Sequence, residues 1–195
     1  VPSDALATAA GTMMARYDAA LAERLARAAV HAGGGVVAAG RLADVLSVAG
    51  RGEEAEAVLA AADGQVGSET DRVTTAVARA QNLTWGLGRF ADAMAVLDQA
   101  QAEVVAARSI DELEAARALL LNWMGRPVEA AALADPLLER SGVAEATVLR
   151  AAAVSAFAAA DCGRYDRAVA LADRYSDRAR LVPDLGLVVP FLWWA

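Results

Sequence analysis

One short stretch of this sequence occurs four times at nearly constant intervals, and the repetition constrains the fold more than any other feature. The copies begin with Gly-Arg at positions 50, 88, 125 and 163, and each reaches an alanine five residues after its glycine. A weaker copy begins at Ala15, so successive copies are separated by 35, 38, 37 and 38 residues. A steady period of this length is typical of helical-repeat solenoids, in which each repeat is one helix pair.

The pattern predicts an all-α fold, a right-handed α–α superhelix of antiparallel helix pairs with about ten helices. Each repeat glycine suits the left-handed residue that ends one helix, and the next helix begins just after it. Hydrophobic residues make up 57% of the chain, largely alanine, and aromatic residues only 5%, which favours closely packed helices over sheets. Because stacked repeats share a continuous core, we expect residues 1–195 to form a single domain, with repeat turns near 15, 50, 88, 125 and 163.

The alanine five residues after each turn position is predicted to lie where the two helices of a pair approach most closely. A larger side chain would overpack this contact. The alanines concerned are Ala20, Ala55, Ala93, Ala130 and Ala168.

Local signals predict where several helices begin and end. Ser3 or Asp4 caps a helix over 5–14, and Ser68 to Asp71 resembles a capping box. Ser109-Ile110-Asp111-Glu112 is a full capping box for a helix that ends at Met124. Pro127 suits a first helical turn, whereas Pro136 is expected to kink or end that helix. The other expected helices lie at 36–49, 52–63, about 69–86, 90–107, 143–161 and 165–180. An apolar stripe at helical spacing is expected on Tyr17, Leu21, Leu25, Ala28 and Ala29. Gly33-Gly34-Gly35 is expected to form the turn that ends this run.

Charge and cysteine content exclude several classes of function. The net charge is −7, which argues against nucleic-acid contact by this segment because phosphate binding needs a basic face. The single cysteine, Cys162, excludes an internal disulfide and fits a reducing compartment. No signal peptide and no membrane-spanning stretch is evident, so we expect a cytoplasmic protein that does not contact a membrane.

The two ends of the sequence suggest a fragment of a larger protein. It begins with Val1, and the next repeat glycine would fall beyond Ala195. A truncated helix is expected at 184–195, where Phe191, Leu192, Trp193 and Trp194 form a strongly apolar end. We expect this end to pack back on the array or to form a homodimer contact.

The repeat unit resembles the tetratricopeptide class, in which a helix, a Gly-x-Tyr/Phe-x-Glu/Asp-Ala turn and a second helix follow one another. The matching residues are Gly163, Tyr165, Asp166 and Ala168, and Gly88, Phe90, Asp92 and Ala93. Segments 21–29, 50–59 and 83–89 further resemble the helical-repeat region of LuxR-family (MalT-like, ATP-binding) transcriptional regulators from actinobacteria. That resemblance implies an ATPase domain and a DNA-binding helix–turn–helix elsewhere in the parent protein, and DNA contact only through the latter.

The sequence offers no set of residues for catalysis or for a metal or other cofactor. Cys162 stands just before a repeat glycine and is interpreted as a small core residue. His31, the only histidine, lacks the partners of a zinc site and is expected to cap a helix end. Paired carboxylates such as Glu53-Glu54 fall at helix starts, where they complement the helix dipole.

The tetratricopeptide resemblance also implies a concave groove lined by the first helix of each pair. Positions six, three and two before each repeat glycine would face it, with Arg150 one turn further back. The candidate groove residues are Asp44, Ser47, Asn82, Trp85, Asn122, Trp123, Arg150, Phe157 and Asp161. Amides and tryptophans on one surface suit a peptide or organic effector. The alternative is that both tryptophans serve packing between repeats.

Two functional hypotheses follow. The first is a non-catalytic sensor and protein-interaction domain of a LuxR-family regulator, in which a protein or small-molecule effector changes how the array packs on its ATPase domain. The second is a free-standing adaptor or scaffold. A helical enzyme is a third, weaker reading because no nucleophile–base or metal set is visible.

Overall fold

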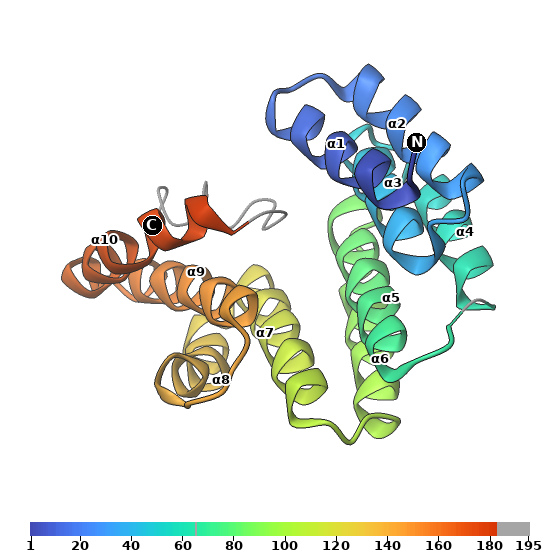
Figure 1. The fold of residues 1–195 in the computed structure, drawn as a ribbon. Coiled ribbons are helices and arrows are strands. Elements are labelled where there is room, and N and C mark those ends of the chain that lie inside the picture. Colours follow the sequence, from blue (N-terminus) through green and yellow to red (C-terminus); the bar gives the residue numbers. More distant parts are fainter. Residues whose placement is uncertain (65, 183–195) are drawn as a thin grey trace. The chain divides into compact units, whose positions relative to one another are not determined.

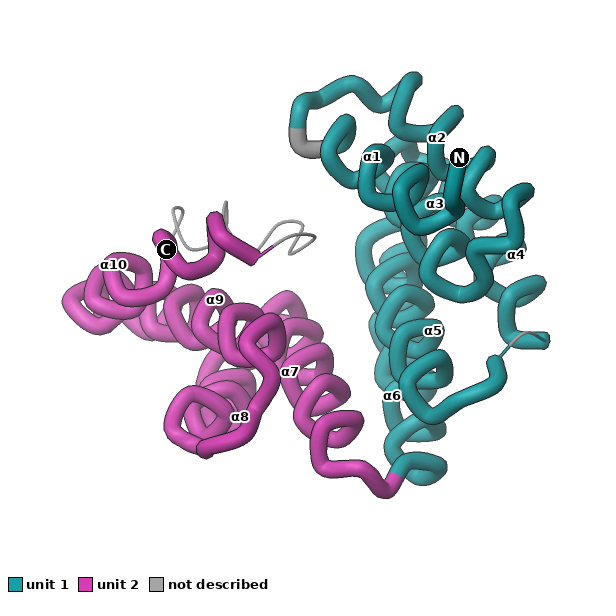
Figure 2. The backbone as a smooth tube through the Cα atoms, in the orientation of Figure 1, with its two compact units in different colours: residues 1–104 teal, residues 105–195 magenta. Residues whose placement is uncertain are grey.

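The computed structural model describes residues 1–64 and 66–182. This part of the chain forms ten α-helices and one short π-helical segment, with no strand, and confirms the all-α prediction (Figure 1). The helices group into two compact units, Val1–Val104 and Val105–Ala195 (Figure 2). The single domain expected over 1–195 stays a prediction. The apolar end and the truncated helix at 184–195 lie outside the described residues.

Unit 1 contains three helix pairs, α1/α2, α3/α4 and α5/α6 (Figure 1). The first helices of successive pairs contact one another, α1 with α3 and α3 with α5, as expected for stacked repeats. The bounds are α1 Ser3–Ala15, α2 Ala19–His31, α3 Gly35–Val48, α4 Gly52–Asp63, α5 Glu69–Gln81, the π-helical segment η1 Asn82–Gly86, and α6 Phe90–Ala102.

Unit 2 contains two helix pairs within its described part. Helix α7 (Ala107–Trp123) pairs with α8 (Pro127–Glu139), and α9 (Glu145–Asp161) pairs with α10 (Tyr165–Leu181). Both α7 and α8 also pack against α9. The stacking of pairs seen in unit 1 is therefore repeated here.

The four repeat glycines adopt the left-handed conformation predicted for them. Their φ angles lie at +74° for Gly50, +66° for Gly88, and +72° for both Gly125 and Gly163. At Gly50, the glycine N–H donates to the carbonyl three residues back, and the following arginine N–H donates to the carbonyl five residues back. The same pair of bonds closes the turns at Gly125 and Gly163, so these helices share one C-terminal cap.

The first turn is centred on Tyr17, and its predicted position at Ala15 is wrong by two residues. Tyr17 has a φ of +62°, and the N–H groups of Tyr17 and Asp18 make the same two bonds to Met14 and Met13. Tyr17 therefore stands where the later copies have glycine. It lies outside the helix and is 95% exposed, so its place in the predicted apolar stripe is wrong. Of the other stripe residues, Ala29 is buried, Leu21 and Leu25 are half-buried, and Ala28 is exposed. The buried face of α2 consists of Ala22, Ala26 and Ala29.

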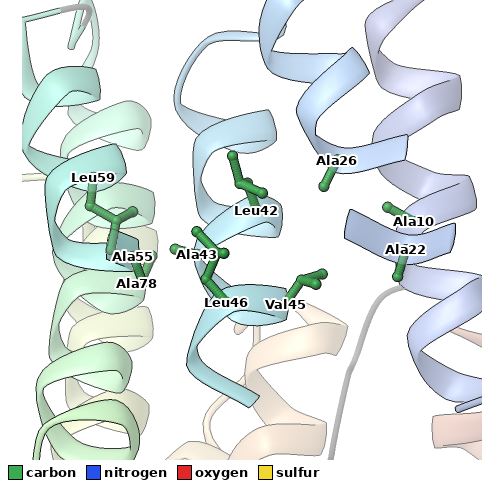
Figure 3. Packing of buried hydrophobic residues seen from close by; sticks show 10 residues of the cluster. All are labelled: Ala10, Ala22, Ala26, Leu42, Ala43, Val45, Leu46, Ala55, Leu59 and Ala78. Carbon is green, nitrogen blue, oxygen red and sulfur yellow. The ribbon is translucent and has the colours of Figure 1, made fainter. Parts of the chain in front are cut away.

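The close-contact prediction is confirmed for four of the five repeat alanines. Ala55, Ala93, Ala130 and Ala168 are each fully buried. Ala20 is exposed, and that prediction is wrong because α2 begins at Ala19, after the cap residue Asp18. The fully buried residue at the matching position is Ala22, which belongs to the core cluster of unit 1 that also contains Ala10, Leu46 and Leu59 (Figure 3).

Two predicted boundaries also differ from the structure, and of the two outcomes expected at Pro136 the helix end does not occur. Helix α6 ends at Ala102 and not near 107. The predicted capping box does not form, because α7 begins at Ala107 and places Ser109 inside its first turn. The carboxylate of Asp111 is buried and lies 2.6 Å from the Arg140 guanidinium. Pro136 does not end α8, which continues to Glu139, whereas Pro127 occupies the first turn as predicted.

The predicted cap at Ser3 or Asp4 is wrong, because α1 already begins at Ser3 and its start has no side-chain cap hydrogen bond. Two other local signals are confirmed. Gly33 and Gly35 adopt positive φ angles in the turn between α2 and α3. Ser68 caps α5, because its Oγ accepts the Asp71 N–H at 3.1 Å. At these two places the chain therefore follows ordinary cap chemistry.

Candidate binding surface

The nine candidate groove residues fall into two groups, one in each unit. Unit 1 holds Asp44 and Ser47 on α3 and Asn82 and Trp85 on η1. Unit 2 holds Asn122 and Trp123 on α7 and Arg150, Phe157 and Asp161 on α9.

Asn82 is a buried structural residue in unit 1. Its Nδ2 donates to the Gly52 carbonyl at 2.9 Å, and its Oδ1 accepts from Ser47 Oγ at 2.5 Å. Only 2% of Asn82 is exposed. The amide thus joins the end of α3, the start of α4 and the π-helical segment, and little of it is available to a ligand.

The π-helical segment adds one residue to the turn that follows it. The Gly88 N–H donates to Thr84, four residues back, and the Arg89 N–H donates to Leu83, six residues back. At Gly125 the matching bonds reach Asn122 and Leu121, three and five residues back. Donor and acceptor are therefore one residue further apart in the chain at Gly88 than at Gly125, in both hydrogen bonds. Inserted residues of this kind are the usual cause of single π-helical turns.

This insertion places the two tryptophans at the same position of their repeats. Trp85 directly follows Thr84, and Trp123 directly follows Asn122, the two residues whose carbonyls accept the turn glycine's N–H. Trp85 is 42% exposed and Trp123 is 41% exposed. Counting from the glycine alone had put them in different positions.

In unit 2, Trp123 is adjacent in sequence to a polar pair. Asn122 Nδ2 donates to Asp161 Oδ2 at 3.4 Å, which brings the ends of α7 and α9 together. Asn122 Oδ1 is buried and has no hydrogen-bond partner among the described residues. Asp161 itself is exposed. Of this pair, the Asp161 carboxylate is the group that solvent can reach, because Asn122 is buried.

The remaining three candidates are occupied by structural contacts. The Arg150 guanidinium lies 3.2 Å from Glu112, and the Asp44 carboxylate lies 3.5 Å from Arg41. Phe157 is half-buried and packs on the core cluster that contains Tyr175. The structure thus brings together Ser47 with Asn82, and Asn122 with Asp161.

Four charged residues of unit 1 form a closed network that was not predicted from the sequence. Arg27 contacts Glu23 at 2.8 Å and Glu54 at 2.6 Å, and Arg51 contacts Glu23 at 2.8 Å and Glu54 at 2.5 Å. Hydrogen bonds from Arg27 and then Arg51 lower the pKa of both carboxylates. The spacings Glu23–Arg27 and Arg51–Glu54 are visible in the sequence, but the cross-pairing of α2 with α4 is not.

The single cysteine and histidine do not build a site. Cys162 is exposed, and its predicted place in the core is wrong because it lies one residue beyond the last helical residue of α9. His31 is exposed and its Nδ1 lies 2.8 Å from the Arg27 carbonyl, as expected for a residue that caps a helix end. Among the described residues, no group of three His, Cys, Asp or Glu side chains could hold a metal ion. Within the same ranges, every helix is too short or too polar to cross a membrane.

Comparisons with known proteins support the fold. No family model and no curated protein matches the sequence. The structure is similar to the crystal structure of a tetratricopeptide repeat protein from Parabacteroides merdae, with a TM-score of 0.50 and 20% sequence identity. The similarity covers 98% of this chain and 72% of that one. At 20% sequence identity this similarity shows the fold alone, and the chain has a tetratricopeptide-like helical-repeat fold.

Proposed function

We propose that this chain is a non-catalytic interaction module that binds a protein or small-molecule effector at the tryptophan-bearing ends of its first helices. The observation that carries the proposal is the shared repeat position of Trp85 and Trp123, both about two-fifths exposed. Tryptophan is enriched among residues that dominate binding energy, since its ring offers a large area at little entropic cost.

A polar neighbour gives Trp123 a directional partner. The exposed carboxylate of Asp161 is bonded to the side chain of Asn122, which precedes Trp123 in the chain, and it can accept a further hydrogen bond from a ligand. On the side of Trp85, the polar candidates Asp44 and Ser47 contact Arg41 and Asn82, so we propose no polar partner for that ring. A ligand with an N–H group and an apolar surface fits the site at Trp123, because it would pair with the carboxylate while covering the ring.

A matched set of variants tests the proposal. Peptides selected from a random library for binding to the wild-type chain should lose at least tenfold in affinity for Trp85→Ala or Trp123→Ala. Val128→Ala is the control, because Val128 is an exposed apolar residue on a second helix. Selected peptides that bind all four proteins equally would refute a role for the tryptophans. Screening a small-molecule collection by thermal shift applies the same variants to organic effectors.

Within this proposal, we place the chain in a LuxR-family transcriptional regulator, where it senses an effector and couples to ATPase and DNA-binding domains. The support is the sequence resemblance of segments 21–29, 50–59 and 83–89. A free-standing adaptor fits the tetratricopeptide-like fold equally well. Reading the parent gene on both sides distinguishes them: nucleotide-binding and helix–turn–helix domains support the regulator, and a gene without them supports the adaptor.

A further inference from the structure

A cavity of about 230 Å³ lies in unit 1, where α2, α3 and α4 meet. It uses none of the candidate groove residues. The lining residues are Arg27, Val30 and His31 from α2, Gly35, Ala39 and Leu42 from α3, and Val58, Ala61 and Ala62 from α4.

Small side chains leave this space unfilled. Ala39, Leu42 and Ala62 are buried, whereas Val30, His31 and Ala61 are exposed, so the cavity is lined by apolar atoms inside and reached from solvent. An apolar cavity of about 150 Å³ is large enough for benzene. The space in unit 1 therefore suits a molecule of one or two fused rings.

The charge beside the cavity is already balanced. The Arg27 Nη2 atom lies 2.8 Å from Glu23 and 2.6 Å from Glu54, and the same carboxylates bind Arg51. Two guanidinium groups face two carboxylates, so the network offers no net positive charge to an anionic ligand. The cavity consequently favours an uncharged ligand.

His31 supplies one hydrogen-bond acceptor at the cavity. Its Nδ1 lies 2.8 Å from the Arg27 carbonyl oxygen, and a carbonyl can only accept, so Nδ1 carries the hydrogen. In the neutral ring, Nε2 then keeps its lone pair and accepts a hydrogen bond. A ligand with one N–H or O–H group satisfies it.

We propose that this cavity binds a small neutral aromatic molecule with a single hydrogen-bond donor, of the indole or phenol class. The apolar lining contacts the ring, the balanced charge at Arg27 gives a carboxylate no net attraction, and His31 accepts the hydrogen bond from the donor. This inference is independent of the proposed function at the tryptophans.

Calorimetric titration with indole tests the inference. Ala61→Leu places a larger side chain at the exposed rim, where folding is not at risk, and should weaken indole binding at least tenfold. Ala60→Leu is the matched control on the neighbouring exposed position, outside the lining, and should bind like the wild type. 1-Methylindole, which lacks the donor, and indole-3-carboxylate, which is charged, should each bind at least threefold more weakly.

Each part of the proposal has an outcome that overturns it. Absence of saturable indole binding, or equal binding by wild type and Ala61→Leu, would remove the cavity as the site. Equal binding of indole and 1-methylindole would remove the donor requirement. Tighter binding of the carboxylate would show that Arg27 is available to anions.

Discussion

Gly52 and Gly86 bring two segments of backbone into direct contact. A Cβ built on Gly52 would lie 2.7 Å from the Gly86 carbonyl oxygen, and one built on Gly86 would lie 3.1 Å from the Gly52 Cα. The contact joins the first turn of α4 to the π-helical segment, and the Asn82 amide holds the same two elements together. Both glycines are needed because any side chain would push these elements apart.

We expect Gly52→Ala to lower the free energy of unfolding by about 1–3 kcal/mol, because the new methyl group must displace backbone. Urea unfolding followed by circular dichroism measures the loss. Gly64→Ala is the control: Gly64 has a right-handed helical backbone with a φ of −65°, and its added Cβ would meet nothing closer than 4.0 Å. Equal destabilisation by the two substitutions would contradict the close contact.

Tyr17→Gly is expected to stabilise the chain by about 1 kcal/mol, because a left-handed backbone strains any residue with a Cβ. The exposed ring of Tyr17 contributes little packing that could offset this gain. Gly163→Ala tests the reverse change and should destabilise by about 1 kcal/mol. Its Cβ would meet nothing within 4 Å, so backbone strain is the cause. Denaturant midpoints that move in the same direction for both variants would count against this explanation.

Ala130→Leu is expected to overpack the contact between α7 and α8 and cost about 1–3 kcal/mol. Ala130 is fully buried in the cluster that includes Ala118 and Leu137. Ala20→Leu makes the same change at an exposed position and should alter stability by less than about 0.5 kcal/mol. Thermal melts compare the two; an unchanged melting temperature for Ala130→Leu would refute the packing model.

The charged network in unit 1 predicts a pH-dependent effect of Glu54→Gln. Arg27 and Arg51 lower the folded-state pKa of Glu54 below its ordinary value of 4.5, so its stabilising effect is present above that value. The effect is lost as the pH falls through the lowered pKa. Wild type and Glu54→Gln should therefore differ in urea midpoint at pH 7 and converge in acid. Glu53→Gln, on the adjacent residue outside the network, serves as the control, and a difference that persists in acid would disprove the linkage.

The later repeat turns could be predicted because their conformation depends on one residue. Glycine is the ordinary occupant of a left-handed cap, so Gly50, Gly125 and Gly163 mark the turns directly. The position predicted for the first turn was wrong because Tyr17 adopts the same left-handed conformation, and no glycine marks that turn in the sequence. The shift of two residues then put Ala20 where Ala22 belongs.

The candidate surface was harder to predict because it depends on residue register. One inserted residue in the π-helical segment changes which side chain occupies each repeat position. The distance in sequence between repeat glycines does not show where this insertion lies. Trp85 and Trp123 were found by their residue type, but their equivalence required the hydrogen bonds of Gly88 and Gly125. The burial of Asn82 likewise depends on Gly52, thirty residues earlier in the chain.

The hydrogen bonds that close each repeat turn also bear on how the chain folds. At Gly50 and Gly125 they join residues at most five positions apart, and at Gly88 at most six. Such short loops carry little closure entropy, so each turn can form before distant parts of the chain have met. Folding can therefore start at any of these turns and spread to its neighbours, which makes several competing nucleation points a built-in kinetic property of this sequence.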